Sequence, residues 1–81
     1  MIMVILAVRD RAADVFGTPM FRLNVGSAVR GFIDEINRVA EDNVMSKHPE
    51  DFDLYVLGKY NDADASFDMH VPRQVCVSSG S

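Results

Sequence analysis

Few residues of this 81-residue sequence belong to the types that most often carry out chemistry. Its two histidines, His48 and His70, have no cysteine or second histidine beside them at metal-ligand spacing. The single cysteine, Cys76, excludes an internal disulfide and lacks the electropositive setting of a reactive thiolate. The sequence contains no glycine-rich phosphate loop, nucleophile elbow or calcium loop. We therefore expect a protein that is not an enzyme and that holds no metal ion or cofactor.

Arginine and aromatic side chains are the best candidates for binding an anionic partner. A guanidinium group offers forked donors to phosphate oxygens, and aromatic rings can stack on unpaired bases. The candidate phosphate-binding residues are Arg9, Arg11, Arg22, Arg30 and Arg38. The candidate stacking residues are Phe16, Phe21, Tyr55 and Tyr60. This combination predicts an interface for single-stranded nucleic acid.

These side chains also have a purely structural interpretation. Arg30 and Arg38 each stand four residues from Asp34 and can pair with it along one helix face. Phenylalanine is more often found in a hydrophobic core than on a binding surface. The formal net charge of −4 opposes nucleic-acid binding, which depends on clustered positive charge. Both interpretations stay open at this level.

The charges are distributed unevenly along the chain. Residues 1–38 hold five arginines and four acidic residues, whereas residues 41–68 hold eight acidic residues and two lysines. Any nucleic acid should therefore meet the first half of the chain. The acidic second half is left for solvent or for a protein partner.

The elements that position these side chains can be predicted from hydrophobic periodicity. Apolar residues from Val25 to Ala40 recur at helical spacing, which predicts one amphipathic helix with Asn24 as its N-cap. Gly31 lies inside this helix and costs about 1 kcal/mol relative to alanine, so we expect close packing there.

Several segments have the composition of strands. They are residues 2–8, 20–23, 52–60 and 67–71, with 75–77 as a continuing edge beyond Pro72. In the first segment both odd-numbered and even-numbered residues are apolar, as in a strand buried on both faces. In the fourth, apolar and polar residues alternate, as in a half-buried strand. Polar residues predict connections over 10–18 and 41–51 and a turn over 61–64.

The order β-β-α-β-β predicts an α+β fold, with one amphipathic helix packed on a mostly antiparallel sheet. We expect a single domain over residues 1–77 and a disordered tail over residues 78–81. A domain of this length buries only about 60% of its unfolded surface, which favours self-association. We expect a homodimer whose interface includes Ile2, Val4, Leu6, Val75 and Val77.

The apolar run at residues 2–8 does not predict a membrane protein. A span takes about 20 apolar residues, and the run also lacks the flanks of a signal peptide. We expect no membrane partner and a cytoplasmic location.

Five segments occur in a fixed order along the chain. They are Arg9-Asp10, Phe16-Gly17-Thr18-Pro19-Met20-Phe21, Gly26-Ser27-Ala28-Val29-Arg30-Gly31-Phe32, His48-Pro49-Glu50-Asp51-Phe52-Asp53-Leu54 and Leu57-Gly58-Lys59-Tyr60-Asn61-Asp62. The ordered set resembles the small nonstructural protein of gokushovirus-type microviruses, the chlamydiaphage-like branch of single-stranded DNA phages. The resemblance spans nearly the whole chain.

The resemblance implies a viral accessory protein in the cytoplasm of a bacterial host. It further implies an association with single-stranded DNA during genome replication or packaging. The alternative is an adaptor that binds a viral or host replication or capsid-assembly protein. Such an adaptor would use its acidic second half or a strand edge.

Overall fold

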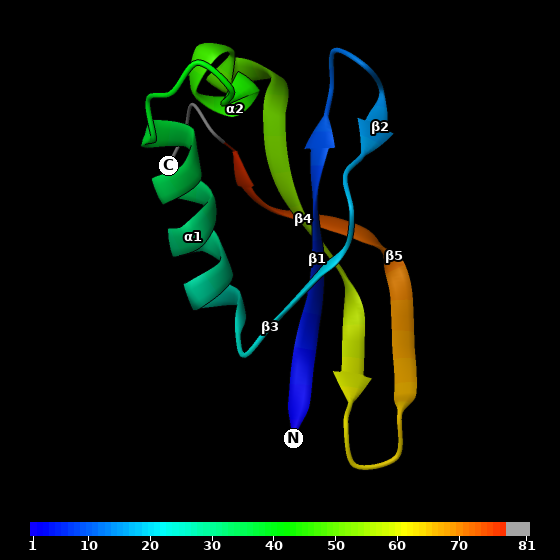
Figure 1. Ribbon diagram of the computed structural model, residues 1–81. Coiled ribbons are helices and arrows are strands. Elements are labelled where there is room, and N and C mark those ends of the chain that lie inside the picture. Colours follow the sequence, from blue (N-terminus) through cyan, green and yellow to red (C-terminus); the bar gives the residue numbers. More distant parts are fainter. Residues whose placement is uncertain (78–81) are drawn as a thin grey trace.

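The computed structural model describes residues 1–77 (Figure 1). Its elements are β1 (Ile2–Asp10), β2 (Val15–Phe16), β3 (Met20–Arg22), α1 (Val25–Asn37), α2 (Val44–Lys47), the 3-10 turn η1 (Pro49–Asp51), β4 (Phe52–Asn61) and β5 (Ser66–Val77). The predicted α+β class is confirmed, with β2 and α2 added inside stretches predicted as connections. No helix in this part of the chain is long and apolar enough to cross a bilayer. The predicted tail at residues 78–81 lies outside the described residues.

β1 is the centre of an antiparallel sheet. It pairs with β4 along one edge and with both β2 and β3 along the other, and β5 extends the sheet beyond β4 (Figure 1). Successive side chains of a strand point to opposite faces, yet Leu6 and Ala7 are both 0% exposed. The expected burial of this strand on both faces is therefore confirmed.

α1 covers one face of the sheet. Its buried residues Ala28, Phe32 and Ile36 pack with Leu6 and Leu54 in the hydrophobic core. These helical positions fall on the predicted apolar stripe, so the amphipathic pattern decides which side of α1 meets the sheet. The predicted N-cap is also confirmed, because the Asn24 side-chain oxygen accepts a hydrogen bond from the Ser27 amide at 2.8 Å.

α1 ends at Asn37, before the predicted apolar stripe is complete. The side-chain amide of Asn43 donates to the carbonyl oxygens of Glu35, at 2.8 Å, and Arg38, at 2.6 Å. The last carbonyl groups of a helix lack partners within it, so Asn43 satisfies them from the following loop. It also caps the start of α2. Val39 consequently lies outside the helix and is 92% exposed.

A β-bulge in β4 changes the alternation of its side chains. Leu6 lies opposite Val56 and Ile5 lies opposite Gly58, so Leu57 has no opposite residue in β1. Residues directly opposite in an antiparallel pair share a face, so Val56 faces α1 and Gly58 faces the other side. Strict alternation of a strand would place these two residues on one face, and the bulge separates them.

β5 continues through Pro72 as one strand, and not as two segments. Its register with β4 shifts between the pairs Gly58–Met69 and Val56–Arg73, which leaves residues 70–72 in a bulge. A proline is tolerated in such a bulge because no ladder hydrogen bond needs its missing N–H. The predicted half-burial of residues 67–71 is wrong, since Val71 is 84% exposed and its neighbours are exposed as well.

The predicted dimer residues are distributed over several environments. Leu6 is fully buried beneath α1 and Val4 packs against the same core, so the prediction of Leu6 as an interface residue is corrected. Ile2 is exposed, Val75 packs against the core, and the side chain of Val77 lies outside the described part. β1 is paired on both sides, so over residues 1–77 the long free edge belongs to β5.

We predict that Gly58→Ala destabilises the fold. A β-carbon at position 58 would lie 2.8 Å from the α-carbon of Met69 and closer still to the carbonyl oxygen of Asp68. Displacing backbone of this kind costs about 1–3 kcal/mol, which urea denaturation followed by circular dichroism would measure. Gly31→Ala is the matched control, because a β-carbon there meets no atom within 4 Å. Equal stability of Gly58→Ala and wild type would contradict the close approach of β5.

Candidate nucleic-acid interface

The face of the sheet opposite α1 carries a group of aromatic side chains, which we call the aromatic face. In the ladders of β1, Phe16 lies opposite Arg9, Phe21 opposite Ile5, Tyr55 opposite Ala7 and Tyr60 opposite Met3. The bulge at Leu57 is the reason that Tyr55 and Tyr60, five residues apart, share this face. The structure therefore brings all four predicted stacking residues to one side of the sheet, and Phe67 joins them because it lies opposite Tyr60.

The aromatic rings form two groups in edge-to-face or tilted contact. Near the β1–β2 turn, the ring centroids of Phe16 and Tyr55 lie 5.4 Å apart. Toward the β4–β5 turn, Tyr60 lies 5.5 Å from Phe21 and 4.8 Å from Phe67. Such separations are typical of favourable aromatic pairs. Each group is therefore held in place by its own ring contacts.

The sheet curls toward the aromatic face. β1 and β4 separate β3 from β5, and in a flat sheet strands three spacings apart would lie roughly 14 Å from one another. Yet the ring centroids of Phe21 in β3 and Phe67 in β5 are 6.5 Å apart. The curl thus gathers rings from the two outer strands above β1.

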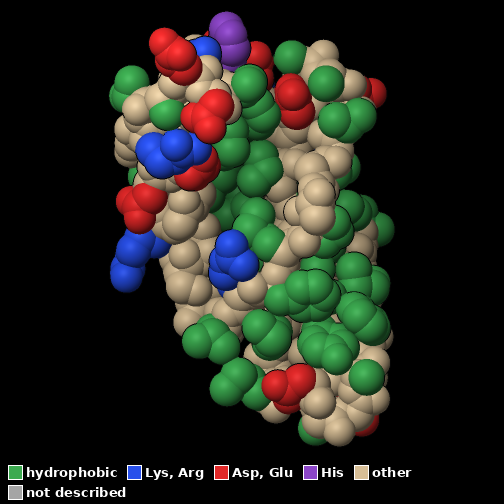
Figure 2. Space-filling view, in the orientation of Figure 1, with side chains coloured by type: hydrophobic (Ala, Val, Ile, Leu, Met, Phe, Trp, Pro, Cys, Tyr) green, Lys and Arg blue, Asp and Glu red, His purple; other side chains and the backbone are tan. Residues whose placement is uncertain are grey.

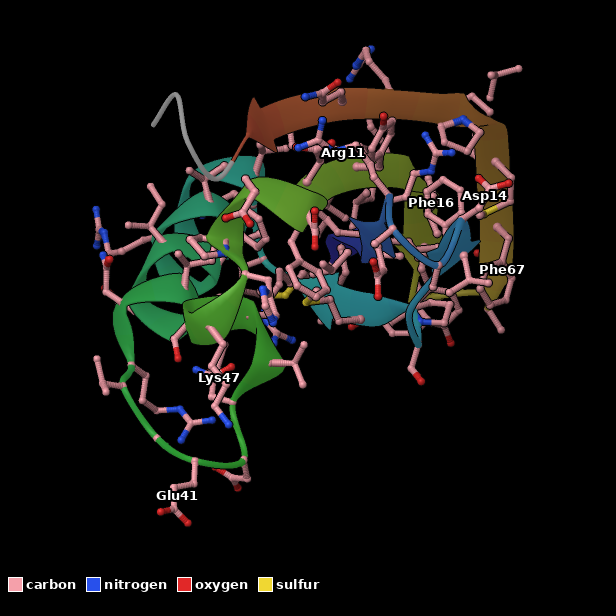
Figure 3. The ribbon with its side chains drawn as sticks, turned by 90° about the horizontal axis from the view of Figure 1, so that it is seen from above. Arg11, Asp14, Phe16, Glu41, Lys47 and Phe67 are labelled. Carbon is pink, nitrogen blue, oxygen red and sulfur yellow. The ribbon has the colours of Figure 1, made fainter. Side chains whose placement is uncertain are left out.

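The aromatic residues cover part of the core and are themselves partly accessible. Ile5 and Ala7 are buried on this face, so the rings serve as a cover for the central strand. The rings themselves stay accessible, with Phe16 44% and Phe67 59% exposed. Figure 3 shows these two phenylalanines on the side of the molecule that faces away from the helices. They can therefore meet a ligand without unfolding the core.

Phe67 was not among the predicted stacking residues. The alternation of its segment was interpreted as a half-buried strand, and the burial that this required is absent. The turn was predicted over residues 61–64, but Asn61 pairs with Ser66, so the turn covers residues 62–65 and Tyr60 and Phe67 flank it symmetrically. In an antiparallel hairpin such residues lie opposite each other and share a face.

Arg9 is the predicted phosphate-binding residue that lies beside the aromatic face. Its guanidinium group lies 5.9 Å from the ring centroid of Phe16 and forms an ion pair of 2.6 Å with Asp14. Hydrogen bonds to the Asp14 carboxylate and to Tyr55 raise the pKa of Arg9 above its ordinary value. Asp14 reaches this position in the β1–β2 turn with a positive φ of 57°, which aspartate tolerates better than most residues. The guanidinium group of Arg9 is thus already paired with a carboxylate of the same chain.

Arg11 has a structural partner. Its Nε lies 3.0 Å from Oδ2 of Asp53, whose side chain is only 3% exposed, and its guanidinium also donates to the carbonyl oxygen of Glu50. The Arg11 amide donates to the carbonyl oxygen of Asp51 at 2.8 Å. These bonds join the β1–β2 turn to the start of β4. The first role of Arg11 is therefore to neutralise a buried carboxylate.

The remaining predicted arginines lie elsewhere. Arg22 lies opposite Val4 and shares the helix-covered face of the sheet, while Arg30 is exposed on α1. Arg38 follows α1 and pairs with Glu35 at 2.7 Å, not with Asp34 as predicted, and this pairing lowers the pKa of Glu35. The five arginines therefore do not converge on one surface, and Arg9 alone accompanies the rings.

The acidic second half does not form one surface. In Figure 2 acidic side chains gather at the end of the molecule that carries α2, and others lie at the far end. Ligand atoms of His48, Glu50 and Asp51 lie within 4.8 Å of one another, a group that spacing alone did not predict. Exposed groups of this kind are common without a metal ion, so the group carries no functional assignment.

The comparison with protein families decides the broad identity of the chain. The sequence model of the family described as Phage ORF5 protein matches residues 3–81. The chain belongs to this phage family. No curated protein and no solved structure matches it. Membership of the Phage ORF5 family confirms a phage origin, whereas the gokushovirus-type assignment stays a prediction.

We predict that Arg11→Ala destabilises this Phage ORF5 family member. The substitution leaves the Asp53 carboxylate buried without a cation, and its Oδ1 atom already lacks a hydrogen-bond partner in the described structure. An unsatisfied buried group costs about 1–3 kcal/mol, measurable as a lower free energy of unfolding in urea. Asp53→Asn in the same background should restore part of the loss, because a neutral amide is easier to bury.

The control for this substitution is Arg30→Ala, which removes an exposed arginine on α1 and should change stability by less than about 0.5 kcal/mol. Equal stabilities of the Arg11→Ala and Arg30→Ala variants would show that the Arg11–Asp53 pair does not hold the turn.

Proposed function

We propose that this phage protein is a non-enzymatic accessory protein that binds single-stranded DNA on its aromatic face. The phage that encodes it would be a gokushovirus-type microvirus. There the protein would act in the cytoplasm of the bacterial host, during genome replication or packaging. Membership of a phage family supports the setting, and the aromatic face supports the binding.

The observation that carries the proposal is the combination of accessible rings with Arg9 on a curled sheet. Single strands expose the faces of their bases, which stack on aromatic side chains irrespective of base identity. Phe16 and Phe67 offer such rings in two separate groups, and Arg9 beside Phe16 offers a cation for the backbone. A base pair inside a duplex cannot stack in this way. The arrangement therefore favours single strands.

The charge pattern limits how strong this binding can be. The net charge is −4, and the arginines do not converge, so few phosphates can be contacted at once. Stacking should therefore contribute more to the free energy of DNA binding than the release of counterions does. For a single strand, the slope of log K against log salt is about −0.7 for each phosphate contacted. We expect a shallow slope.

We predict that labelled oligothymidylate binds at low salt and that Phe16→Ala and Phe67→Ala each weaken the binding. Loss of one stacked base costs about 1–3 kcal/mol, so each substitution should raise the Kd by about 5- to 150-fold in fluorescence anisotropy. Val39→Ala is the control, since this residue is 92% exposed beyond the end of α1 and lies off the sheet. Absence of binding to wild type at low salt would eliminate direct DNA binding.

We also predict that Asp14→Asn tightens DNA binding. The substitution removes the carboxylate that pairs with Arg9, and asparagine tolerates the positive φ of this position. Because the pair is exposed, we expect a Kd roughly two- to fivefold lower. Asp42→Asn makes the same change in net charge in the loop after α1, and it should leave the Kd closer to that of wild type. If both substitutions lowered the Kd equally, the change in net charge alone would explain the tighter binding.

The adaptor remains as the alternative function, and the free edge of β5 favours it. β5 pairs with β4 alone within residues 1–77, and Met69 and Val71 are exposed along it. An open edge with apolar side chains can accept a strand from another protein or from a second copy. Partners captured from infected-host extract separate the two functions. Partners that persist after nuclease treatment support the adaptor, and partners lost with the nucleic acid support DNA binding.

A further inference from the structure

A groove of about 270 Å³ lies between α1 and the sheet, on the face opposite the aromatic residues. Its walls are mainly apolar, with Val8, Met20, Phe32 and Met45 among the lining residues. Figure 2 shows hydrophobic side chains exposed in the hollow between α1 and the strands. Burial of this surface would be favourable, so the groove is suited to receive an apolar group.

Gly31 forms part of the wall of this groove, and packing does not account for it. Close packing at Gly31 was the expected reason for a glycine in mid-helix, and this prediction is wrong. A β-carbon built there meets no atom within 4 Å. The glycine nevertheless costs the helix about 1 kcal/mol relative to alanine. Its effect in the structure is to leave the groove open where a side chain would project.

Arg22 provides a charge at the same groove. Its Nη1 donates to the carbonyl oxygen of Phe21 at 2.9 Å, and no carboxylate in residues 1–77 lies within ion-pair distance of it. The other charged lining residue, Glu35, is neutralised by Arg38 at 2.7 Å. The groove therefore combines apolar walls with one uncompensated positive charge.

We propose that this groove binds the large apolar side chain of a protein segment that carries a carboxylate beside it. The volume is below the roughly 300–1,000 Å³ of sites for small-molecule ligands, and it suits one anchoring side chain. Two methionines in the walls can adapt to the shape of the anchor. The carboxylate would pair with Arg22. This site is separate from the aromatic face and does not depend on DNA binding.

The test uses methyl-labelled methionine, because the chain places reporters both inside and outside the groove. The probes are two blocked pentapeptides with a central phenylalanine, flanked by aspartate in one and by asparagine in the other. We expect the methyl signals of Met20 and Met45 to shift saturably, whereas those of Met1 and Met69 stay in place. The aspartate peptide should bind about two- to fivefold more tightly, and Arg22→Gln should remove this advantage.

A second variant fills the groove. The β-carbon of Gly31→Leu meets no atom within 4 Å, so this variant should fold as wild type does and abolish the methyl shifts. Asn37→Leu adds the same side chain at the exposed end of α1 and should leave them unchanged. Absence of a saturable shift at millimolar peptide, or peptide binding that survives in Gly31→Leu, overturns the proposal. Equal binding of both peptides overturns the assignment of Arg22.

Discussion

The bulge at Leu57 is the constraint on which the arrangement of this protein depends. One residue without an opposite partner in β1 turns Val56 toward α1 and Gly58 toward the other face. β4 therefore contributes side chains both to the core beneath α1 and to the aromatic face. At the same point Gly58 lets β5 approach closely, which a side chain would prevent. The bulge also places Tyr60 on the face where its ring contacts Phe21 and Phe67.

The two faces of the sheet have different physical characters. The helix face is a conventional core with an open groove beside Gly31, whereas the opposite face is covered by rings that stay partly exposed. Three arginines, Arg9, Arg11 and Arg38, already pair with carboxylates of the same chain. Acidic residues also outnumber lysine and arginine by twelve to eight. The binding that we propose should therefore depend on aromatic and apolar surface more than on net charge.

Local physical chemistry accounts for the parts of the fold that the sequence predicted. The helical spacing of apolar residues and the capping oxygen of Asn24 are properties of neighbouring residues, and both were confirmed. The end of α1 was not predictable from the same stripe. It depends on Asn43, whose side chain donates to the carbonyl oxygens of Glu35 and Arg38 where the helix ends. A loop residue decided this boundary because it bonds across several positions of the chain.

The sequence alone determined the α+β class, the strand buried on both faces and the residue types of the interface that we propose. It also pointed to a phage protein, which membership of the Phage ORF5 family confirms. Only the tertiary structure decided which of those residues meet. Strict alternation would have separated Tyr55 from Tyr60, and the charge pattern left open whether the arginines share a surface. The register, the bulge and the curl of the sheet arise because strands that are distant in the sequence pair with one another. This pairing brings the aromatic rings together. Of the five predicted arginines, it places Arg9 beside them.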